Sequence, residues 1–531
     1  MRKLILVVFL FIAGNAMAQT WQDTVQKIEK LFEPLHNAPG AQLAISRNGE
    51  LLFSKAWGMA NLEHDVPLFT YSLTEAGSVS KQFVAACILL LEQQGKLSLE
   101  DDIRKYFPEL PDYGAPVKLR HMMQHTSGLR DWGSVAALTG WPRSTKTYNN
   151  QDALQIISRQ KALNNVPGAE YIYSNSNYNL FALLIERVSG LSLADYSRRY
   201  IFDPAGMKLS QWRDDFKRVV KNRATGYDPV QNGYETNMPN EYVYGNGGML
   251  TTAEELLKWN HFYLAGKFGT PSLLEKQLYS YPFNNGNKNS YAAGLTIYTT
   301  NGWKDITHNG ATAGYRADLH YFPDLGLSIA WLSNNAKPTN AVMEVINLFV
   351  PKSVGKEQAA APVAFNIPAN VIHSYAGWYR NERSGEGLEL TMKDGSLMFR
   401  TQKLFPISNE DFTSGASKIH FTPKGFRLIT GGNDTVFYHG VPPADPGPTA
   451  FQQYLGAYAS EETESELTLF QKDEKLMVRL RPALEFELKP TYRDGFTSPA
   501  GAVFFERDKE NRIIAMRISS GRARNVLFKR K

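Results

Sequence analysis

The sequence has almost no cysteine: Cys87 is the only one among 531 residues. A single thiol cannot form an internal disulfide, so a protein of this length must depend on buried hydrophobic cores for its stability. Cys87 lies within an apolar run that is typical of a buried helix, and no histidine is adjacent to it. We therefore expect Cys87 to pack in a core and not to act as a nucleophile.

Charge of one sign and long hydrophobic runs are also scarce. The chain has 58 basic and 52 acidic residues, a net charge of +6, and no long basic run, so a nucleic-acid partner is not indicated. No segment after the N-terminus is apolar enough to cross a membrane. The ten histidines form no HExxH motif. Neither a metal nor another cofactor is expected.

The first eighteen residues are typical of an export signal. A basic start, Arg2-Lys3, precedes an apolar run over 4–13, and Ala16-Met17-Ala18 has the small-x-small pattern of a signal-peptidase site. The run is too short to span a bilayer. We expect cleavage after Ala18 and a mature protein that is periplasmic or secreted.

Two stretches rich in proline and small residues divide the remainder of the chain. They cover 351–368 and 442–450, and their composition is that of linkers. A length of 531 residues, at roughly 100–200 residues per domain, favours about three domains. We expect these units at 19–350, 369–441 and 451–531.

The second and third units resemble each other. The segment Tyr375-Ala-Gly-Trp-Tyr379 recurs as Tyr454-Leu-Gly-Ala-Tyr458, and 388–400 recurs at 467–479, both at an offset of 79 residues. One constant offset indicates an internal duplication. Each copy alternates apolar and polar residues around a Lys-Asp turn, the pattern of a β-hairpin with one buried face. We predict two small antiparallel β-barrels or rolled sheets, which either are structural modules or shape the substrate site of the first unit.

The first unit has strand patterns at both ends and helical patterns between them. The strands are expected at 42–46, 50–53, 316–321 and 327–332, and the helices at 81–94 and 152–160. Asn48-Gly49 is a strong signal for a hairpin turn between the first two strands. This arrangement predicts an α+β domain whose two ends share one antiparallel sheet.

A serine and a lysine at the start of the first apolar helix are the best candidates for a reactive pair. In Gly77-Ser78-Val79-Ser80-Lys81 the lysine follows the serine by one helical turn, so its amine can approach the Ser78 hydroxyl. Backbone N–H groups at a helix start can stabilise an oxyanion. Burial lowers the pKa of a lysine and favours the neutral amine that a base requires. The same Ser-x-x-Lys spacing at Ser158 and Ser353 lacks apolar surroundings.

Two further motifs follow in order. Tyr173-Ser-Asn175 lies downstream, and His308-Asn-Gly310-Ala311 comes after it. The ordered set Ser-x-x-Lys, Tyr-x-Asn and His-x-Gly resembles the motif set of the serine β-lactamase and penicillin-binding-protein superfamily. A Gly-x-Ser-x-Gly elbow, the mark of an α/β-hydrolase, is absent from the sequence. Ser78 therefore has no competing candidate.

Additional segments extend the resemblance over about residues 35 to 350. His125-Thr-Ser-Gly-Leu129, Phe202-Asp-Pro-Ala-Gly-Met207 and Gly247-Gly-Met-Leu-Thr-Thr-Ala253 are similar to recurrent segments of one branch of that superfamily. The branch holds class C β-lactamases, certain esterases and D-aminopeptidases. For His125 and these glycines we expect roles in turns and in anchoring loops.

The resemblance implies a role for each motif residue. Ser78 would be the acylated nucleophile, and Lys81 would accept its proton together with Tyr173. Asn175 would help to hold Lys81 and the substrate amide. The oxyanion hole would lie at the N–H groups of Ser78 and Ala311.

The His-x-Gly box departs from the more usual Lys-Thr-Gly box. A lysine there is a permanent cation for a substrate carboxylate, whereas His308, expected on an edge strand beside the site together with Gly310, would be neutral at pH 7. Arg316 follows a few residues later and is a candidate to supply the charge instead. The resemblance alone therefore does not imply recognition of a β-lactam carboxylate.

A catalytic domain with this box and two β modules resembles the three-domain D-aminopeptidases of the superfamily. In those proteins a loop from a C-terminal barrel reaches the cleft and restricts it to small substrates. We expect an exported serine hydrolase of small molecules or short peptides, with cell-wall-derived peptides that contain D-amino acids as the first hypothesis. The alternatives are a carboxylesterase and a penicillin-binding-type sensor that is acylated without turnover.

Overall fold

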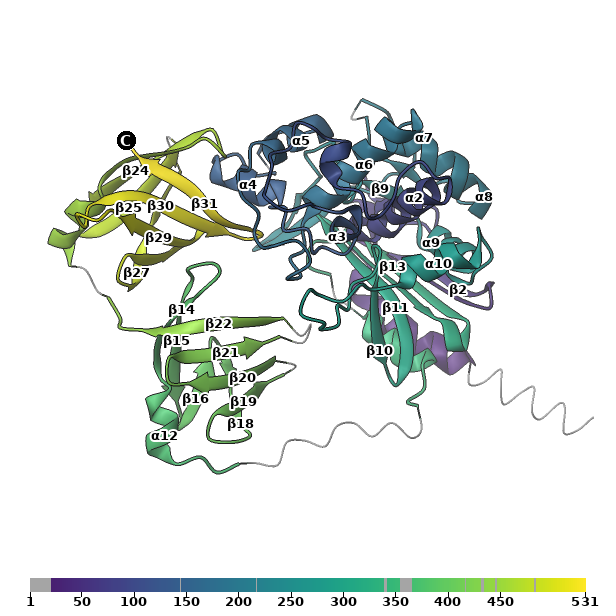
Figure 1. The fold of residues 1–531 in the computed structure, drawn as a ribbon. Coiled ribbons are helices and arrows are strands. Elements are labelled where there is room, and N and C mark those ends of the chain that lie inside the picture. Colours follow the sequence, from purple (N-terminus) through teal and green to yellow (C-terminus); the bar gives the residue numbers. More distant parts are fainter. Residues whose placement is uncertain are drawn as a thin grey trace, which may run out of the picture.

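The computed structural model describes residues 21–531 apart from 144, 216, 339–340, 354–364, 416, 431–433, 445–446 and 482–483. The expected export signal lies outside these residues. A large N-terminal lobe of helices and sheet is followed in the chain by two smaller lobes built of strands (Figure 1). No helix in the described ranges is long and apolar enough to cross a membrane.

A six-stranded antiparallel sheet with the order β10-β11-β12-β13-β1-β2 forms one layer of the N-terminal lobe. Its strands are β1 (Ala41–Arg47), β2 (Glu50–Trp57), β10 (Thr296–Thr300), β11 (Trp303–Thr312), β12 (Tyr315–Phe322) and β13 (Leu327–Ser333). β1 pairs antiparallel with β13, which confirms that the two ends of this lobe share one sheet. At the predicted hairpin, Asn48 and Gly49 both have positive φ, 52° and 87°, as a tight turn between twisted strands requires.

The two faces of this sheet pack on different helices. Leu43 and Trp331 are buried in one cluster with the helix over 21–32 and with α11 (Val342–Phe349). Ala44, the neighbour of Leu43, points to the opposite face and joins the larger core of the remaining helices. The alternation follows from the two-residue period of a strand.

The central helix of the lobe is α2 (Lys81–Gln93), which follows directly after the 3-10 turn η2 (Gly77–Ser80). All its residues from Lys81 to Leu91 are buried, and Cys87 is among them. The helix expected at 152–160 is α5 (Asn150–Ser158), which begins earlier because Asn149 caps it and accepts hydrogen bonds from the backbone of its first turn.

The other helices and short strands of the lobe surround α2 or connect it to the sheet. The helices are η1 (Glu33–Leu35), η3 (Ile103–Lys105), α3 (Leu119–Met123), α4 (Trp132–Leu138), α6 (Asn175–Ser189), α7 (Leu193–Ser197), η4 (Arg198–Phe202), α8 (Asp203–Ala205), α9 (Ala253–Trp259), η5 (Asn260–Leu264), α10 (Pro271–Leu278) and η6 (Pro323–Leu325). The strands are β3 (Met59–Asn61), β4 (Val66–Pro67), β5 (Thr74–Glu75), β6 (Gln211–Trp212), β7 (Tyr227–Val230), β8 (Gly233–Thr236) and β9 (Met249–Thr251).

The two smaller lobes have the same topology. We call the first of them in the chain module 1 and the second module 2. The sheet of module 1 is ordered β17-β16-β15-β14-β22-β21-β20-β19-β18, and that of module 2 is ordered β26-β25-β24-β23-β31-β30-β29-β28-β27. In each module the two edge strands are consecutive in the chain and one residue apart, so the sheet curls until its edges nearly meet. The predicted α+β fold with two rolled antiparallel sheets is confirmed.

Module 1 comprises α12 (Ala369–Ser374), β14 (Gly377–Asn381), β15 (Gly387–Lys393), β16 (Ser396–Phe399), β17 (Gln402–Lys403), β18 (Phe405–Pro406), β19 (Asp411–Ser414), β20 (Ser417–Thr422), β21 (Gly425–Ile429) and β22 (Thr435–Val441). Module 2 comprises η7 (Pro448–Tyr454), β23 (Gly456–Ser460), β24 (Ser465–Lys472), β25 (Lys475–Arg481), β26 (Leu484–Glu487), β27 (Lys489–Tyr492), β28 (Gly495–Ser498), β29 (Gly501–Arg507), β30 (Ile513–Ser520) and β31 (Ala523–Arg530).

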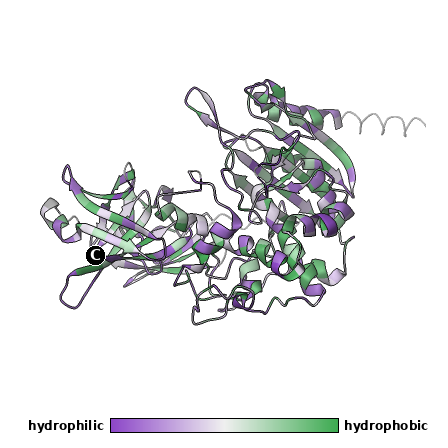
Figure 2. Cartoon of the chain, turned by 90° about the horizontal axis from the view of Figure 1, so that it is seen from above, coloured by the Kyte–Doolittle hydropathy of each residue, from purple (hydrophilic) through white to green (hydrophobic). Residues whose placement is uncertain are grey.

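Hydrophobic residues gather inside the N-terminal lobe and alternate with polar ones along the strands of the modules (Figure 2). The buried hydrophobic residues of module 2 belong to one contiguous cluster with those of the N-terminal lobe. Those of module 1 form a separate cluster. The last part of the chain is therefore the one that is integrated with the lobe.

Candidate active site

The predicted pair Ser78 and Lys81 lies at the junction of η2 and α2. Lys81 Nζ is 3.1 Å from Ser78 Oγ and 3.0 Å from Asn175 Oδ1, and it also contacts the carbonyl oxygen of Asn246. The lysine side chain is fully buried. Burial, reinforced by the positive charge of Arg522, holds the pKa of the Lys81 amine well below its usual range.

The neighbours of the Lys81 amine determine how its hydrogens are arranged. A neutral amine has two hydrogens and one lone pair. The Asn246 carbonyl can only accept, and Asn175 Oδ1 is also an acceptor, so these two oxygens take the two hydrogens. The lone pair is then left for the Ser78 hydroxyl. This is the arrangement of a base ready to remove the serine proton.

Tyr173 lies immediately before α6 with its ring beside the same amine. Its ring centroid is 4.8 Å from Lys81 Nζ. The buried hydroxyl makes no hydrogen bond of normal geometry with the described residues. Burial raises its pKa, a rise that the Ser78 side chain opposes. A protonated hydroxyl at this position can donate to the leaving group of a substrate.

His125 packs against the ring of Tyr173. The two rings lie 4.0 Å apart between centroids, and His125 Nδ1 accepts a hydrogen bond of 3.1 Å from the backbone N–H of Ser174. The expected anchoring of a loop by His125 is thus what these contacts provide.

His308 lies in β11, with its ring centroid 6.4 Å from that of Tyr173. β11 is the second strand of the sheet and not its edge, but its pairing with β10 stops at Thr307. The predicted edge position therefore applies only to the second half of the strand. His308 Nδ1 lies 2.6 Å from the carbonyl oxygen of Asn309, and since a carbonyl only accepts, this nitrogen carries the hydrogen. Nε2 then accepts from the Tyr291 hydroxyl, 2.9 Å away.

The pKa of His308 is lowered to about 4 by burial and by the nearby Lys81. The ring is therefore neutral at pH 7, as the sequence indicates. It cannot act as the permanent cation that a lysine would be at this position.

Two glycines allow β11 to approach the nucleophile. A Cβ atom placed on Gly310 would lie 2.1 Å from the Ala76 carbonyl oxygen, and one placed on Gly77 would lie 2.7 Å from the backbone nitrogen of Ala311. Gly77 also has a φ of +52°, which favours glycine. The backbone of Ala311 consequently lies beside Ser78, where the resemblance places the oxyanion hole.

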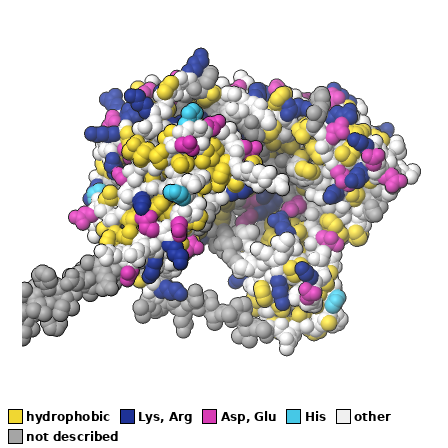
Figure 3. Space-filling model, turned by 180° about the vertical axis from the view of Figure 1, so that it is seen from behind, with side chains coloured by type: hydrophobic (Ala, Val, Ile, Leu, Met, Phe, Trp, Pro, Cys, Tyr) yellow, Lys and Arg dark blue, Asp and Glu magenta, His cyan; other side chains and the backbone are white. Residues whose placement is uncertain are grey.

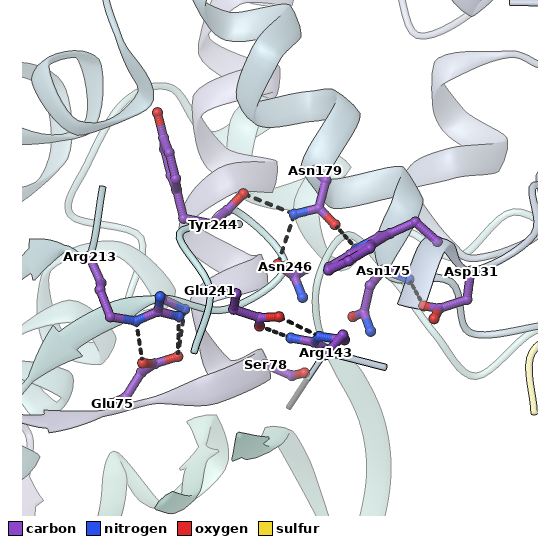
Figure 4. A network of polar contacts seen from close by, with 12 residues as sticks. Glu75, Ser78, Asp131, Arg143, Asn175, Asn179, Arg213, Glu241, Tyr244 and Asn246 are labelled. Atoms are coloured by element: carbon purple, nitrogen blue, oxygen red, sulfur yellow. Dashed lines mark hydrogen bonds and ion pairs between the residues drawn. The ribbon is translucent and has the colours of Figure 1, made fainter. Parts of the chain in front are cut away.

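Ser78, Tyr173, His308 and Ala311 line a cavity of about 590 Å³. Tyr171, Tyr291 and Tyr298 form part of its wall. Two ion pairs also line it, Glu75 with Arg213 and Glu241 with Arg143 (Figure 4). In the space-filling view the molecule is hollowed between the N-terminal lobe and the two modules, and charged side chains lie within the hollow (Figure 3).

Arg316 does not line this cavity, in contrast to its suggested role in binding substrate charge. Its Nη1 donates instead to the carbonyl oxygens of Ala313 and Tyr315 in its own hairpin turn. Besides the paired Arg143 and Arg213, the wall contains a third arginine, Arg522, from the turn between β30 and β31 of module 2. A loop of the last module thus reaches the cavity, as the resemblance implies.

Several residues of the site were not found from the sequence, among them Asn246, Asp131 and Arg522. Asn246 holds the Lys81 amine through its backbone carbonyl, and Asp131 Oδ2 accepts from the backbone N–H of Asn175 at 2.8 Å. Arg522 is more than 400 residues from Ser78 in the chain. A glycine-rich segment around Asn246 was the one available signal. Within the described ranges, no group of three histidine, cysteine or acidic residues is placed to hold a metal.

Comparisons with known proteins agree with this fold. The family model described as Beta-lactamase matches residues 28–347. The chain is 26% identical over 472 residues to a D-aminopeptidase of Cereibacter sphaeroides, with 85% of each chain covered. It is 30% identical to penicillin-binding protein 4* of Bacillus subtilis, covering 74% of this chain and 92% of that one. The octameric penicillin-binding protein homologue from Pyrococcus abyssi has a similar fold, with a TM-score of 0.53, 21% identity and coverage of 87% and 99%.

Proposed function

The chain belongs to the beta-lactamase family of serine hydrolases, and from this premise we propose that it is an exported enzyme that cleaves amide bonds next to D-amino acids through an acyl-enzyme on Ser78. The observation that carries the proposal is the Lys81 amine, which is buried, bound to two oxygen acceptors and 3.1 Å from Ser78 Oγ.

The first half of the reaction is acylation. Ser78 Oγ attacks the substrate carbonyl carbon while Lys81 takes the hydroxyl proton. The developing oxyanion is stabilised by the N–H groups of Ser78 and Ala311, and loss of one such donor costs on the order of 3 kcal/mol. Tyr173 donates a proton to the leaving nitrogen, which frees the amine product, and Tyr173 regains a proton from Lys81. Water then attacks the acyl-enzyme carbonyl, the acid is released, and one water proton returns to Ser78 Oγ.

The choice of D-amino-acid substrates is supported by the relatives named D-aminopeptidase, because the match extends over 85% of this chain. That span is longer than the family match at 28–347 and so takes in part of the region after it. We include in the proposal the division into units at 19–350, 369–441 and 451–531, with linkers at 351–368 and 442–450. Cleavage of the export signal after Ala18 and recognition of short cell-wall peptides belong to the same proposal.

The test uses D- and L-alanine p-nitroanilide and p-nitrophenyl acetate with the wild-type protein and with Ser78→Ala. We expect turnover of the D-anilide, none of the L-anilide, and a loss of about 10⁴-fold or more in Ser78→Ala. Mass spectrometry after treatment with a fluorophosphonate should place the adduct on Ser78. An unmodified Ser78 in protein that is still active would end the proposal.

Two other outcomes identify the alternatives. Turnover of the ester without the D-anilide would favour a carboxylesterase. A burst equal to the enzyme concentration, followed by no steady state, would favour a sensor that is acylated without release.

A further inference from the structure

Module 2 places one cationic side chain in the wall of the cavity. Arg522 occupies the turn between β30 and β31, and its guanidinium lies over the ring of Tyr173, 4.6 Å from the ring centroid. Tyr173 in turn is beside Lys81. The Arg522 guanidinium and the Lys81 amine therefore both contact the ring of Tyr173, although Arg522 belongs to a different lobe.

The other charges of the wall are already paired. Three arginines and two glutamates line the cavity. Arg213 Nε donates to Glu75 at 2.9 Å, and Arg143 forms two hydrogen bonds with Glu241. Among the described residues, no carboxylate forms an ion pair with Arg522.

The two remaining basic groups beside the cavity both have lowered pKa values. Burial lowers the pKa of Lys81 well below its usual range and that of His308 to about 4. The lining consequently has one excess positive charge, and it is located on Arg522. Each of the two lining glutamates is paired with an arginine. Neither glutamate is therefore available to bind an ammonium group of a substrate.

The turn that carries Arg522 is held firmly. The Arg522 carbonyl accepts from the backbone N–H of Asp131 at 3.2 Å and from Asn164 Nδ2 at 2.9 Å. Its own N–H donates to Ser134 Oγ at 3.1 Å. The side chain itself remains exposed. Backbone contacts thus fix the position of the turn and leave the guanidinium available to a ligand.

A second set of contacts fixes the same hairpin from the other side. Glu170, three residues before Tyr173, accepts from Arg524 at 2.8 Å and from Arg383 of module 1 at 2.7 Å. Asn525 Nδ2 donates to the Arg383 carbonyl at 2.8 Å. The three lobes therefore meet at one buried carboxylate next to the segment that carries Tyr173.

We propose that Arg522 binds a carboxylate of the substrate and so selects peptides with an anionic group next to the scissile bond. The inference rests on the proposed function, since it assigns the substrate class of the same site. An arginine forms two parallel hydrogen bonds with a carboxylate, which fixes both position and orientation. The carboxylate is either the free C-terminus of the leaving residue or an acidic side chain on the acyl side.

The experiment measures binding to the full-length Ser78→Ala protein, in which turnover does not interfere. One arm compares N-acetyl-D-alanyl-D-alanine with its C-terminal amide. The other arm compares N-acetyl-D-glutamyl-D-alanine amide with the corresponding D-glutamine compound. We expect the acid to bind about ten- to a hundredfold more tightly than its neutral partner in one arm, which identifies the source of the carboxylate.

Variants of Arg522 test whether the preference for the acid over its neutral partner depends on this residue. Arg522→Gln should abolish it, and Arg522→Lys should retain part of it, because a lysine keeps the charge but not the paired geometry. Arg512→Gln is the matched control, since Arg512 lies at the other end of β30 in an exposed ion pair with Asp508. It should retain the full preference.

Equal binding of both members in both arms, no binding of any compound, or a preference that survives in Arg522→Gln would overturn the inference. Turnover by the wild-type protein separates it from the proposed function. A carboxylate preference without turnover of the D-anilide or of either acidic D-peptide removes only the function, and turnover of these compounds without the preference removes only the role of Arg522.

Discussion

The two β modules have the same strand order but different relations to the rest of the molecule. Module 2 shares its hydrophobic core with the N-terminal lobe, whereas module 1 has a core of its own. Arg481 of module 2 stacks on Trp141 of the N-terminal lobe at 3.5 Å, and Arg130 of that lobe forms a buried ion pair with Glu462 at 2.6 Å. A duplicated fold has therefore been placed in two different environments.

Module 1 contacts module 2 as well as the N-terminal lobe. The Tyr492 hydroxyl of module 2 donates to the Gly385 carbonyl of module 1, and Arg383 of module 1 reaches Glu170. Module 2 thus supplies the turn that enters the cavity, and module 1 supports that turn from outside. The difference shows that topology determines the shape of a module, whereas its surface side chains determine which parts of the molecule it contacts.

The largest expected effect concerns the docking of module 2. The side chains of Arg130 and Glu462 are 1% and 7% exposed. In Glu462→Gln the guanidinium would remain buried without a counter-charge, which destabilises proteins by about 3–5 kcal/mol. Urea unfolding at pH 7 should show this loss as a lower midpoint.

Glu464→Gln is the matched control for this change, because Glu464 belongs to the same turn but is 63% exposed in its ion pair with Arg159. An exposed pair contributes at most about 1 kcal/mol. Equal losses in the two variants would mean that module 2 is not held by the buried pair.

Much of the fold was predictable because it follows from local patterns. The duplication is one example: Tyr379 donates to the Tyr375 carbonyl at 2.9 Å, and Tyr458 donates to the Tyr454 carbonyl at the same distance. The repeated tyrosines thus make the same contact in each module. Such a contact joins residues only four positions apart, so it can be predicted from the local sequence.

The candidate site was predictable only in part, for the same reason. Ser78 and Lys81 are one helical turn apart, and their proximity follows from helix geometry. The position of Arg522 depends on how module 2 packs against α4, and no local pattern contains that information. Arg316 was suggested because it is near His308 in the chain, but its hairpin turn supplies carbonyl acceptors that keep it away from the cavity.

Between pH 7 and 4.5, protonation of histidines should affect the N-terminal lobe and not module 2, which has no histidine. The pKa of buried His308 is about 4 in the folded protein and about 6.5 when unfolded. Between these values the unfolded chain binds more protons, so stability falls as the pH is lowered from about 6.5 to 4. One such group changes the free energy of unfolding by up to about 1.4 kcal/mol per pH unit.

His308→Gln should reduce this dependence by about one proton, measured as the change in urea midpoint and slope between pH 7 and 4.5. The slope will not vanish, because burial also lowers the pKa of His121 to about 4. The exposed His36 of the same lobe provides the control variant His36→Gln, which should keep the wild-type slope. Identical slopes in the two variants would show that His308 is not held neutral by the fold.

The smallest expected effect concerns the contact between the modules. Tyr492→Phe removes the hydrogen bond to the Gly385 carbonyl, and a single hydrogen bond contributes about 1 kcal/mol. If module 1 supports module 2 through this bond, hydrogen exchange should become faster in both modules. Tyr379→Phe removes a bond of the same kind inside module 1 and should affect module 1 alone. Unchanged exchange in module 2 after Tyr492→Phe would mean that this hydrogen bond does not stabilise module 2, and the support of the turn carrying Arg522 by module 1 would then rest on other contacts, such as that of Asn525 with the Arg383 carbonyl.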